Sequence, residues 1–495
     1  MPATLSEGTP ATQPPQPRRL PPLTETIISE LRQQWRIAAP LALMNLTCFA
    51  KTIITTVFLG RLGGLHLAGG ALGFTVANVT GFSVLSGLSA AMEPICGQAH
   101  GAGNRQLLRL TLLMAVLLLL AASLPIALIW FNADKILLCF GQQPEIAGIA
   151  KKFVVFLIPE LPVTSFLNPL RAYLSSQGVI LPSLFSSAMA LALHLPLNLL
   201  LSKNRGLEGI AMAVWITDLT VAAMQALYVY IKEEEISGIC SYWKKSSPEI
   251  WKRVVRLAVP CCLTTCLEWW CFEILVLLTG KLPDADRMLA VIAVVFNFDY
   301  LLFSVMLSLA IGASVRVANE LGSGHGHSAR ASAGVSLGMG ALGGVLGAAA
   351  TAAAATGGWG ELFSGDSRVL KGVRKTMMVM AAVEIVNFPL AVSGGIARGT
   401  GRPWFGTCAS AGGFYLVALP AAAALGFKMR LGLDGMLLGF LAGGSAGVVL
   451  LLAFLAKIDW TREAENAQTL AGISLDGGDQ SDCFEIVNNH KPVDV

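Results

Sequence analysis

Long apolar blocks separated by short polar segments make up most of the chain. A membrane-spanning helix needs about 20 consecutive, mainly apolar residues. The blocks have that length and lack the strict alternation of strands. They predict an all-α membrane protein with twelve transmembrane helices in two sets of six. The expected spans are 37–59, 67–92, 107–131, 153–174, 180–201 and 209–231, then 257–279, 289–313, 331–356, 373–396, 404–427 and 433–457.

Composition supports this prediction. Of the 495 residues, 54% are hydrophobic and only 13% are charged, whereas about a quarter of the residues in a soluble domain are charged. That excludes a soluble globule, a disordered chain or a coiled coil as the main architecture. The net charge of +4 is small, and no long basic stripe points to a nucleic-acid partner.

The second half of the chain repeats motifs of the first half. Residues 98–103 (QAHGAG) match residues 319–324 (NELGSG) at an offset of 221, and GLEG at 206–209 matches GLDG at 432–435 at an offset of 226. Such an ordered repeat predicts two pseudo-symmetric six-helix lobes around a central cleft. Six helices per repeat is an even number, so the lobes are related by an axis along the membrane normal.

Five regions follow from these patterns. We expect a disordered tail over 1–30, an N-lobe over 31–231, a polar linker over 232–256, a C-lobe over 257–457 and a second disordered tail over 458–495. The side of the membrane that would carry both tails and the linker holds 20 lysine and arginine residues, and the opposite side holds 14. This excess places both termini and the linker in the cytoplasm.

Ionisable residues inside the spans are the candidates for function, because charge in hydrocarbon is costly. The seventh span contains Glu268 and Glu273 beside Trp269 and Trp270. A spacing of five residues separates the two carboxylates by roughly 140° around an ideal helix, so we expect them to face different neighbours. Carboxylates next to aromatic faces are suited to an organic cation.

Other candidates lie in both predicted lobes. Glu384 and Asn387 are one turn apart in the tenth span, just before Pro389, which is expected to kink that helix. Asn297 and Asp299 belong to the eighth span. In the N-lobe, Lys51 lies among residues 41–59 that are almost all apolar or small, and we expect it to pair with Glu93 or Asp218. Glu93 itself precedes Pro94, which favours an exposed or capping role, and His194 is expected to be a hydrogen-bonded core residue.

The sequence lacks the motifs that metal-dependent enzymes and ATP-driven transporters require. The sequence has no HxxxH or HExxH pattern, no second acidic cluster beside Asp284 and Asp286, and no GxxxxGK[ST] motif. We therefore predict no metal, no cofactor, no ATP-driven transport and no enzyme activity. We expect a monomer.

Five motifs resemble those of the multidrug and toxic compound extrusion (MATE) family, and in particular its plant DETOXIFICATION-type members. They are VFLGRLG (57–63), MEPICGQAHGAGN (92–104), LEWWCFE (267–273), RVANELGSG (316–324) and GGIARGTGRP (394–403). The resemblance spans residues 30–457. It implies two six-helix lobes and the export of organic cations, secondary metabolites or hormones by cation antiport, usually with protons in plant members.

The resemblance also implies site residues. Glu268 and Glu273 match the paired glutamates of eukaryotic members. The acid of the tenth helix often lies eleven positions before the motif arginine, here Arg398; that position holds Asn387, and Glu384 lies one turn earlier.

We therefore expect Glu268, Glu273 and Glu384 to couple transport to protons, with sodium as the alternative cation. Substrate-binding residues are expected to be Lys51, Trp269, Trp270, Asn297, Asp299 and Asn387. Two alternatives remain open at this point: a lipid-linked sugar flippase of the same fold, and a transporter-like sensor. Substrate and destination membrane are not indicated by the sequence.

Overall fold

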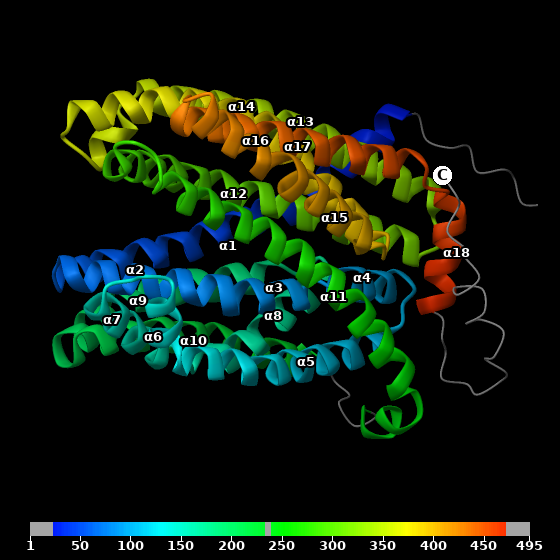
Figure 1. The fold of residues 1–495 in the computed structure, drawn as a ribbon. Helices are drawn as coiled ribbons and strands as arrows, with labels where there is room; N and C mark the ends of the chain where they lie inside the picture. Colours follow the sequence, from blue (N-terminus) through cyan, green and yellow to red (C-terminus); the bar gives the residue numbers. More distant parts are fainter. Residues whose placement is uncertain (1–22, 233–238, 472–495) are drawn as a thin grey trace, which may run out of the picture.

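The computed structural model describes residues 23–232 and 239–471, and these residues form helices joined by short turns, without strands (Figure 1). Eleven helical segments of this described part are long and apolar enough to cross a membrane. The all-α prediction is confirmed.

Helices α1 to α10 form the N-lobe and helices α11 to α17 form the C-lobe. The two lobes are stacked as two layers in Figure 1. The N-lobe comprises α1 (Leu23–Arg61), α2 (Gly64–Ala77), η1 (Asn78–Phe82), α3 (Ser83–Ser89), α4 (Met92–Gly101), α5 (Arg105–Phe131), α6 (Ala133–Cys139), α7 (Pro144–Phe156), α8 (Glu160–Ser176), α9 (Leu181–Arg205) and α10 (Leu207–Lys232). The C-lobe comprises α11 (Ile239–Thr279), α12 (Ala285–Gly322), α13 (Gly326–Thr356), η2 (Trp359–Leu362), α14 (Ser367–Gly399), α15 (Pro403–Ser410), η3 (Ala411–Ala418), α16 (Leu419–Ala423), η4 (Ala424–Lys428) and α17 (Gly432–Ala456).

Three of the expected spans are irregular. The span expected over 153–174 is divided between α7 and α8, and Pro159 lies at the break, where it has no N–H to donate to a continuous helix. This divided segment joins the eleven continuous ones to give the twelve-helix layout. The second and eleventh spans contain π-helical turns over Asn78–Phe82, Ala411–Ala418 and Ala424–Lys428.

The expected boundaries need three corrections. Residues 23–30 of the expected N-terminal tail are helical, because Glu30 is buried and accepts two hydrogen bonds from Arg316, at 2.9 and 2.8 Å. Residues 460–471 of the expected C-terminal tail form a further helix, α18 (Trp460–Ala471). The expected linker is helical from Ile239, where α11 begins. The remaining parts of both tails lie outside the described residues.

Helix α18 lies across one end of the molecule, which we call the α18 end (Figure 1). Its last carbonyl groups accept hydrogen bonds from both lobes: Asn104 Nδ2 donates to Ala471 O at 2.8 Å, and Arg253 Nη1 donates to Leu470 O at 2.9 Å. Arg402 also donates to Glu463. These contacts explain why a polar, amphipathic segment is helical here.

The two repeats pack against each other reciprocally. A Cβ added to Gly101 would lie 2.1 Å from Asn319 O, and a Cβ added to Gly322 would lie 2.2 Å from Gln98 O. Gly101 and Gly322 are equivalent by the offset of 221, as are Gln98 and Asn319. Each repeat therefore presents the same glycine to the same partner position, as two-fold pseudo-symmetry requires. The two-lobe prediction is confirmed.

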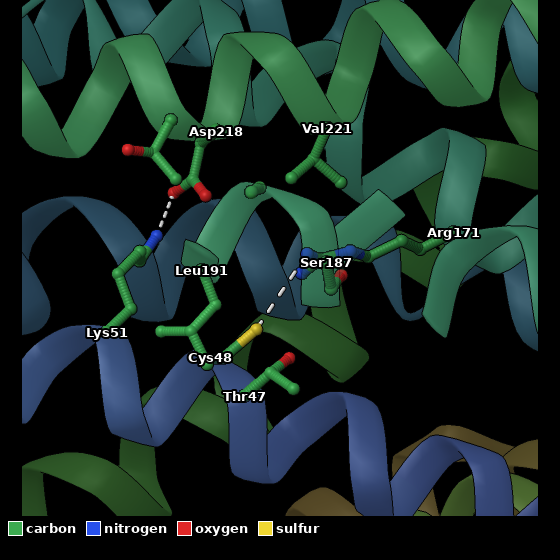
Figure 2. A pocket seen from close by; sticks show the side chains of 10 residues that line it. Thr47, Cys48, Lys51, Arg171, Ser187, Leu191, Asp218 and Val221 are labelled. Atoms are coloured by element: carbon green, nitrogen blue, oxygen red, sulfur yellow. Dashed lines mark hydrogen bonds and ion pairs between the residues drawn. The ribbon is translucent and has the colours of Figure 1, made fainter. Parts of the chain in front are cut away.

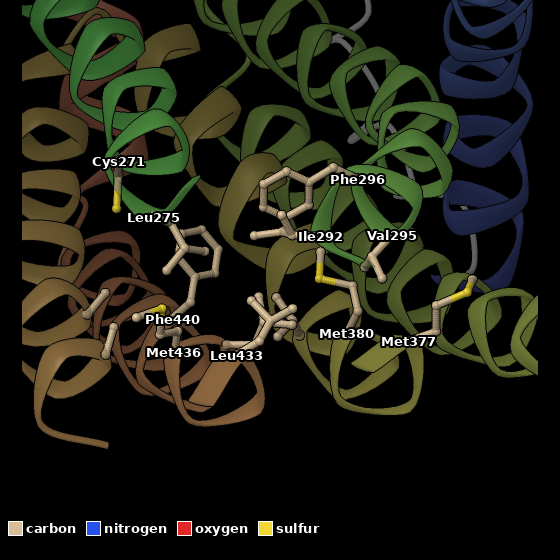
Figure 3. Close-up of a cluster of buried hydrophobic side chains, with 14 of the residues drawn as sticks. Cys271, Leu275, Ile292, Val295, Phe296, Met377, Met380, Leu433, Met436 and Phe440 are labelled. Carbon is tan, nitrogen blue, oxygen red and sulfur yellow. The ribbon is translucent and has the colours of Figure 1, made fainter. Parts of the chain in front are cut away.

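Each lobe has its own core. In the C-lobe, Leu275, Phe296, Met380 and Phe440 come from α11, α12, α14 and α17 and belong to one buried cluster (Figure 3). In the N-lobe, a cluster that includes Leu119, Trp130 and Phe153 joins α5 to α7. Because close-packed interiors resist deformation, each lobe is expected to move as a unit.

The lobes also meet along an α1–α12 seam and an α3–α11 seam. In one seam, Asn45 Nδ2 of α1 donates to Ser308 Oγ of α12 at 3.0 Å. In the other, a Cβ on Gly87 of α3 would lie 2.6 Å from Cα of Cys262 in α11. The Gly87 seam leaves no room for an added atom.

Candidate functional site

A pair of carboxyl groups lies inside the C-lobe. Asp299 of α12 and Glu384 of α14 are 9% and 1% exposed, and their carboxyl groups are close enough to influence each other electrostatically. Two ionised carboxylates buried this close to each other would repel, which is unfavourable unless a proton or another cation lies with them.

Asn387 completes the polar face of α14, one turn after Glu384, and is 7% exposed. Phe388 is buried beside it, and Pro389 lies inside the helix. The structure thus brings together three of the predicted site residues: Asp299, Glu384 and Asn387.

Glu268 lies elsewhere in the same lobe. Its Oε1 accepts a hydrogen bond from Ser410 Oγ of α15 at 3.0 Å, and the positive charge of Arg398 acts on its carboxyl group. Arg398 Nε also lies 3.2 Å from Glu93 Oε2 of the N-lobe. Glu268 is therefore connected to the contact between the lobes, not to the Asp299–Glu384 pair.

Glu273 faces a different neighbour from Glu268, as their spacing predicts. It is half-buried, and its charge acts on Tyr300 of α12. Among the described residues, the carboxylates of Glu273 and Glu268 share no common partner.

The aromatic and amide candidates are divided among different contacts. Trp270 is 39% exposed and donates its Nε1–H to Val79 O of η1 at 2.9 Å, across the lobe boundary. Trp269 is half-buried. Asn297 donates to Ala293 O of its own helix at 2.8 Å, so one of the two N–H groups on its Nδ2 is already engaged.

Lys51 forms an ion pair inside the N-lobe (Figure 2). Its Nζ lies 2.5 Å from Asp218 Oδ2, and the side chains are 15% and 13% exposed. Asp218 in turn contacts the carboxyl group of Glu160, which accepts a further hydrogen bond from Thr164 at 2.9 Å. The expected pairing of Lys51 with Asp218 is found, and the ammonium group is largely neutralised by it.

A small cavity adjoins this ion pair. It has a free volume of about 10 Å³, roughly one water molecule, and it is lined by Thr47, Cys48, Lys51, Arg171, Ser187, Ala190, Leu191, Thr217, Asp218 and Val221 (Figure 2). Arg171 enters it with Nη2 3.8 Å from Cys48 Sγ. A drug-sized substrate does not fit this space, so Lys51 as a direct substrate contact finds no support in this conformation.

Two further expectations about single residues can be compared with the structure. His194 is fully buried and lies 3.0 Å from Thr55 Oγ1 and 2.8 Å from Thr217 Oγ1, which confirms a satisfied core histidine. The expectation that Glu93 could be exposed is wrong. Glu93 is 8% exposed and bonds Arg398 of the other lobe.

Sequence reasoning missed Glu160 and Arg171. Glu160 follows Pro159 at the break between α7 and α8, and reading 153–174 as one uninterrupted span hid its depth. Arg171 stands near the end of that span, where a snorkelling side chain would be expected.

Comparison with known proteins identifies the class to which this fold and these buried acids belong. The sequence profile of the MatE family matches residues 40–200 and 260–423. The chain belongs to the MatE family. It is therefore an integral multi-pass membrane protein and a transporter of small organic compounds, not an enzyme.

Individual relatives agree with this assignment. Protein DETOXIFICATION 56 of Arabidopsis thaliana is 52% identical over 451 residues, which cover 90% of this chain and 92% of the relative. Protein DETOXIFICATION 51 of the same plant is 36% identical over 91% of this chain and 84% of its own length.

A solved structure has the same arrangement of helices. The crystal structure of the eukaryotic MATE transporter AtDTX14 superimposes with a TM-score of 0.83 at 29% identity and covers 90% of this chain and 100% of that chain. A MOP superfamily transporter from Pyrococcus furiosus has a TM-score of 0.77 at 15% identity, over 92% of this chain and 99% of that one. The second likeness concerns the fold alone.

Proposed function

We propose that this chain exports a small organic compound with a cationic or polar group in exchange for protons, by alternating access of the two lobes. The observation that carries the proposal is the contact between the carboxyl groups of Asp299 and Glu384. A shared proton and a cationic ligand can satisfy the same pair of acids, so their binding is mutually exclusive.

In the proposed cycle, the pair binds substrate when both acids are ionised. Protons that enter from the opposite side neutralise the two acids and release the substrate. Asn387 would orient the ligand beside Glu384. Glu268 would act at a distance from this pair, through Arg398 and the Glu93 link between the lobes.

We further propose that the α18 end faces the cytoplasm, since both termini and the linker carry the larger share of positive charge. The contacts between the lobes at that end would then close the path to the cytoplasm. A conformation open to that side requires the Glu93–Arg398 contact and the Gly87–Cys262 seam to separate.

A lipid-linked sugar flippase would be expected to have a basic cleft. Lys51 and Arg398 are both paired with carboxylates, so their positive charges do not support that alternative. A sensor would bind ligand without turnover. Purified protein in liposomes with an imposed pH gradient separates these cases. We expect gradient-driven uptake of organic cations such as tetraethylammonium by the wild type, and ligand binding without uptake would favour the sensor.

A further inference from the structure

Two cysteine side chains meet at the α3–α11 seam. Cys262 and Cys266 are one turn apart in α11, and their Sγ atoms lie 3.9 Å from each other. Residues four positions apart lie on one face of a helix, so the spacing of the two thiols is maintained by α11 alone and does not depend on the neighbouring lobe.

Both thiols also contact the N-lobe. Cys262 Sγ lies 3.8 Å from Val84 O, and Cys266 Sγ lies 3.8 Å from Ser83 Oγ. Cys266 is 4% exposed and Cys262 is half-buried. While the seam is closed, Cys266 is therefore covered and Cys262 is partly covered, and parting of α3 from α11 would expose both sulfur atoms more fully.

Other cysteines of the described part lie in different surroundings. Cys96, Cys261 and Cys271 are buried in apolar clusters, whereas Cys139 and Cys408 are exposed. The Cys262–Cys266 pair combines a second thiol at close range with a surface that alternating access would open.

We propose that Cys262 and Cys266 form a binding site for trivalent arsenicals and chemically similar thiophilic acceptors that make two bonds to sulfur. With phenylarsine oxide, both S–H bonds break and two As–S bonds form. The As–O bond breaks, and the oxygen leaves as water with the two thiol protons. Arsenic keeps its oxidation state, so no oxidant or reductant is consumed.

Ligand binding and seam closure compete. Gly87 leaves less than a methyl group of space against Cys262, so an arsenic atom and its phenyl ring would prevent α3 from returning to α11. The bound arsenical would hold the lobes apart at the α18 end. Only this conformational part rests on the proposed function, since the formation of the adduct requires no transport.

Intact mass spectrometry of the purified full-length chain in detergent tests the site. After treatment with phenylarsine oxide, we expect one adduct that survives washing with 2-mercaptoethanol and is removed by 2,3-dimercaptopropanol, the behaviour of a dithiol chelate. Cys262→Ser and Cys266→Ser should each lose it. The matched Cys139→Ser/Cys408→Ser variant should keep it.

The seam-opening requirement is tested by rate. Glu93→Gln weakens a lobe contact on the α18 side, and we expect it to accelerate adduct formation severalfold. For the adduct measurement by mass spectrometry, Cys262→Ala and Cys266→Ala serve as second variants in case serine disturbs packing.

An adduct that survives in both single-serine variants, or one that 2-mercaptoethanol removes, overturns the proposed site. An unchanged rate in Glu93→Gln overturns the opening requirement. Absence of proton-driven uptake with the adduct intact would reject the proposed function alone.

Discussion

Glu93 and Arg398 join the two lobes: Oε2 of Glu93 lies 3.2 Å from Nε of Arg398, although 305 residues separate them in sequence. Both side chains are mostly buried, at 10% and 18% exposed. Removing one partner of a buried ion pair leaves the other charge uncompensated, which costs about 3–5 kcal/mol.

Glu93→Gln should therefore favour conformations in which the lobes separate at the α18 end. Spin labels at the exposed positions Ala102 of the N-lobe and Arg330 of the C-lobe would report the change by double electron–electron resonance as a longer distance or a second, longer population. The exposed Glu145→Gln variant is the control. A distribution identical to that of the wild type would contradict a role for this pair in holding the lobes together.

The Lys51–Asp218 ion pair gives a second prediction. Lys51→Met leaves Asp218 beside Glu160 without its cation and should destabilise the protein by about 3–5 kcal/mol. The double variant Lys51→Met/Asp218→Asn removes both charges and should recover part of that loss. Thermal unfolding in detergent measures both.

The surface pair Lys152–Glu208, at 2.8 Å and much more exposed, provides the comparison. Lys152→Met should change stability by less than about 1 kcal/mol. If the double variant at Lys51 and Asp218 is no more stable than Lys51→Met, the two charges do not act as a pair.

Equivalent glycines of the two repeats should be equally intolerant of substitution. Gly101→Ala and Gly322→Ala would each place a methyl group about 2 Å from a backbone carbonyl oxygen of the other repeat. This distance is too short for a carbon–oxygen contact, so each substitution would push α4 and α12 apart. Gly334 and Gly338 have open space around their Cβ positions, so the same substitution there should be neutral. Monodisperse yield on size-exclusion chromatography distinguishes the four variants.

Docking of α18 should depend on pH through Glu463. Burial raises the pKa of Glu463, although Arg402 opposes the change by hydrogen bonding to the carboxylate. An acid with a raised pKa in the docked state stabilises docking below its ordinary pKa, and this contribution is lost as pH rises through the raised value. Docking should therefore weaken on going from acidic to neutral pH.

The mobility of a spin label at the exposed position Glu465 measures that docking. Its pH dependence should disappear in Glu463→Gln, which is permanently uncharged. A label that is equally mobile at both pH values in the wild type would exclude Glu463 as the responsible group.

The sequence could predict the architecture well, because the signals for it are local. Apolar blocks of span length and the repeat at an offset of 221 were sufficient for twelve helices and two lobes. It also placed Lys51 with Asp218 as one of two possible partners, since few acids in the N-lobe lie at membrane depth.

Partners across the lobe boundary were not predictable in the same way. Glu93 pairs with Arg398, and Glu30 with Arg316, only because helices distant in sequence cross there. The contact of Asp299 with Glu384 likewise depends on how α12 and α14 rotate against each other. Helix α18 was missed since its apolar face is short, and its ordering comes from Asn104 and Arg253.

The most direct test of the central claim is the initial rate of uptake driven by an inward-acidic pH gradient in liposomes that contain Glu384→Gln or Asp299→Asn. Either variant removes one member of the acid pair, and we expect the rate to fall by about tenfold or more, equivalent to about 1.4 kcal/mol. The exposed Glu145→Gln control should transport like the wild type. Wild-type gradient-driven rates in both acid variants would contradict the assignment of proton coupling to this pair.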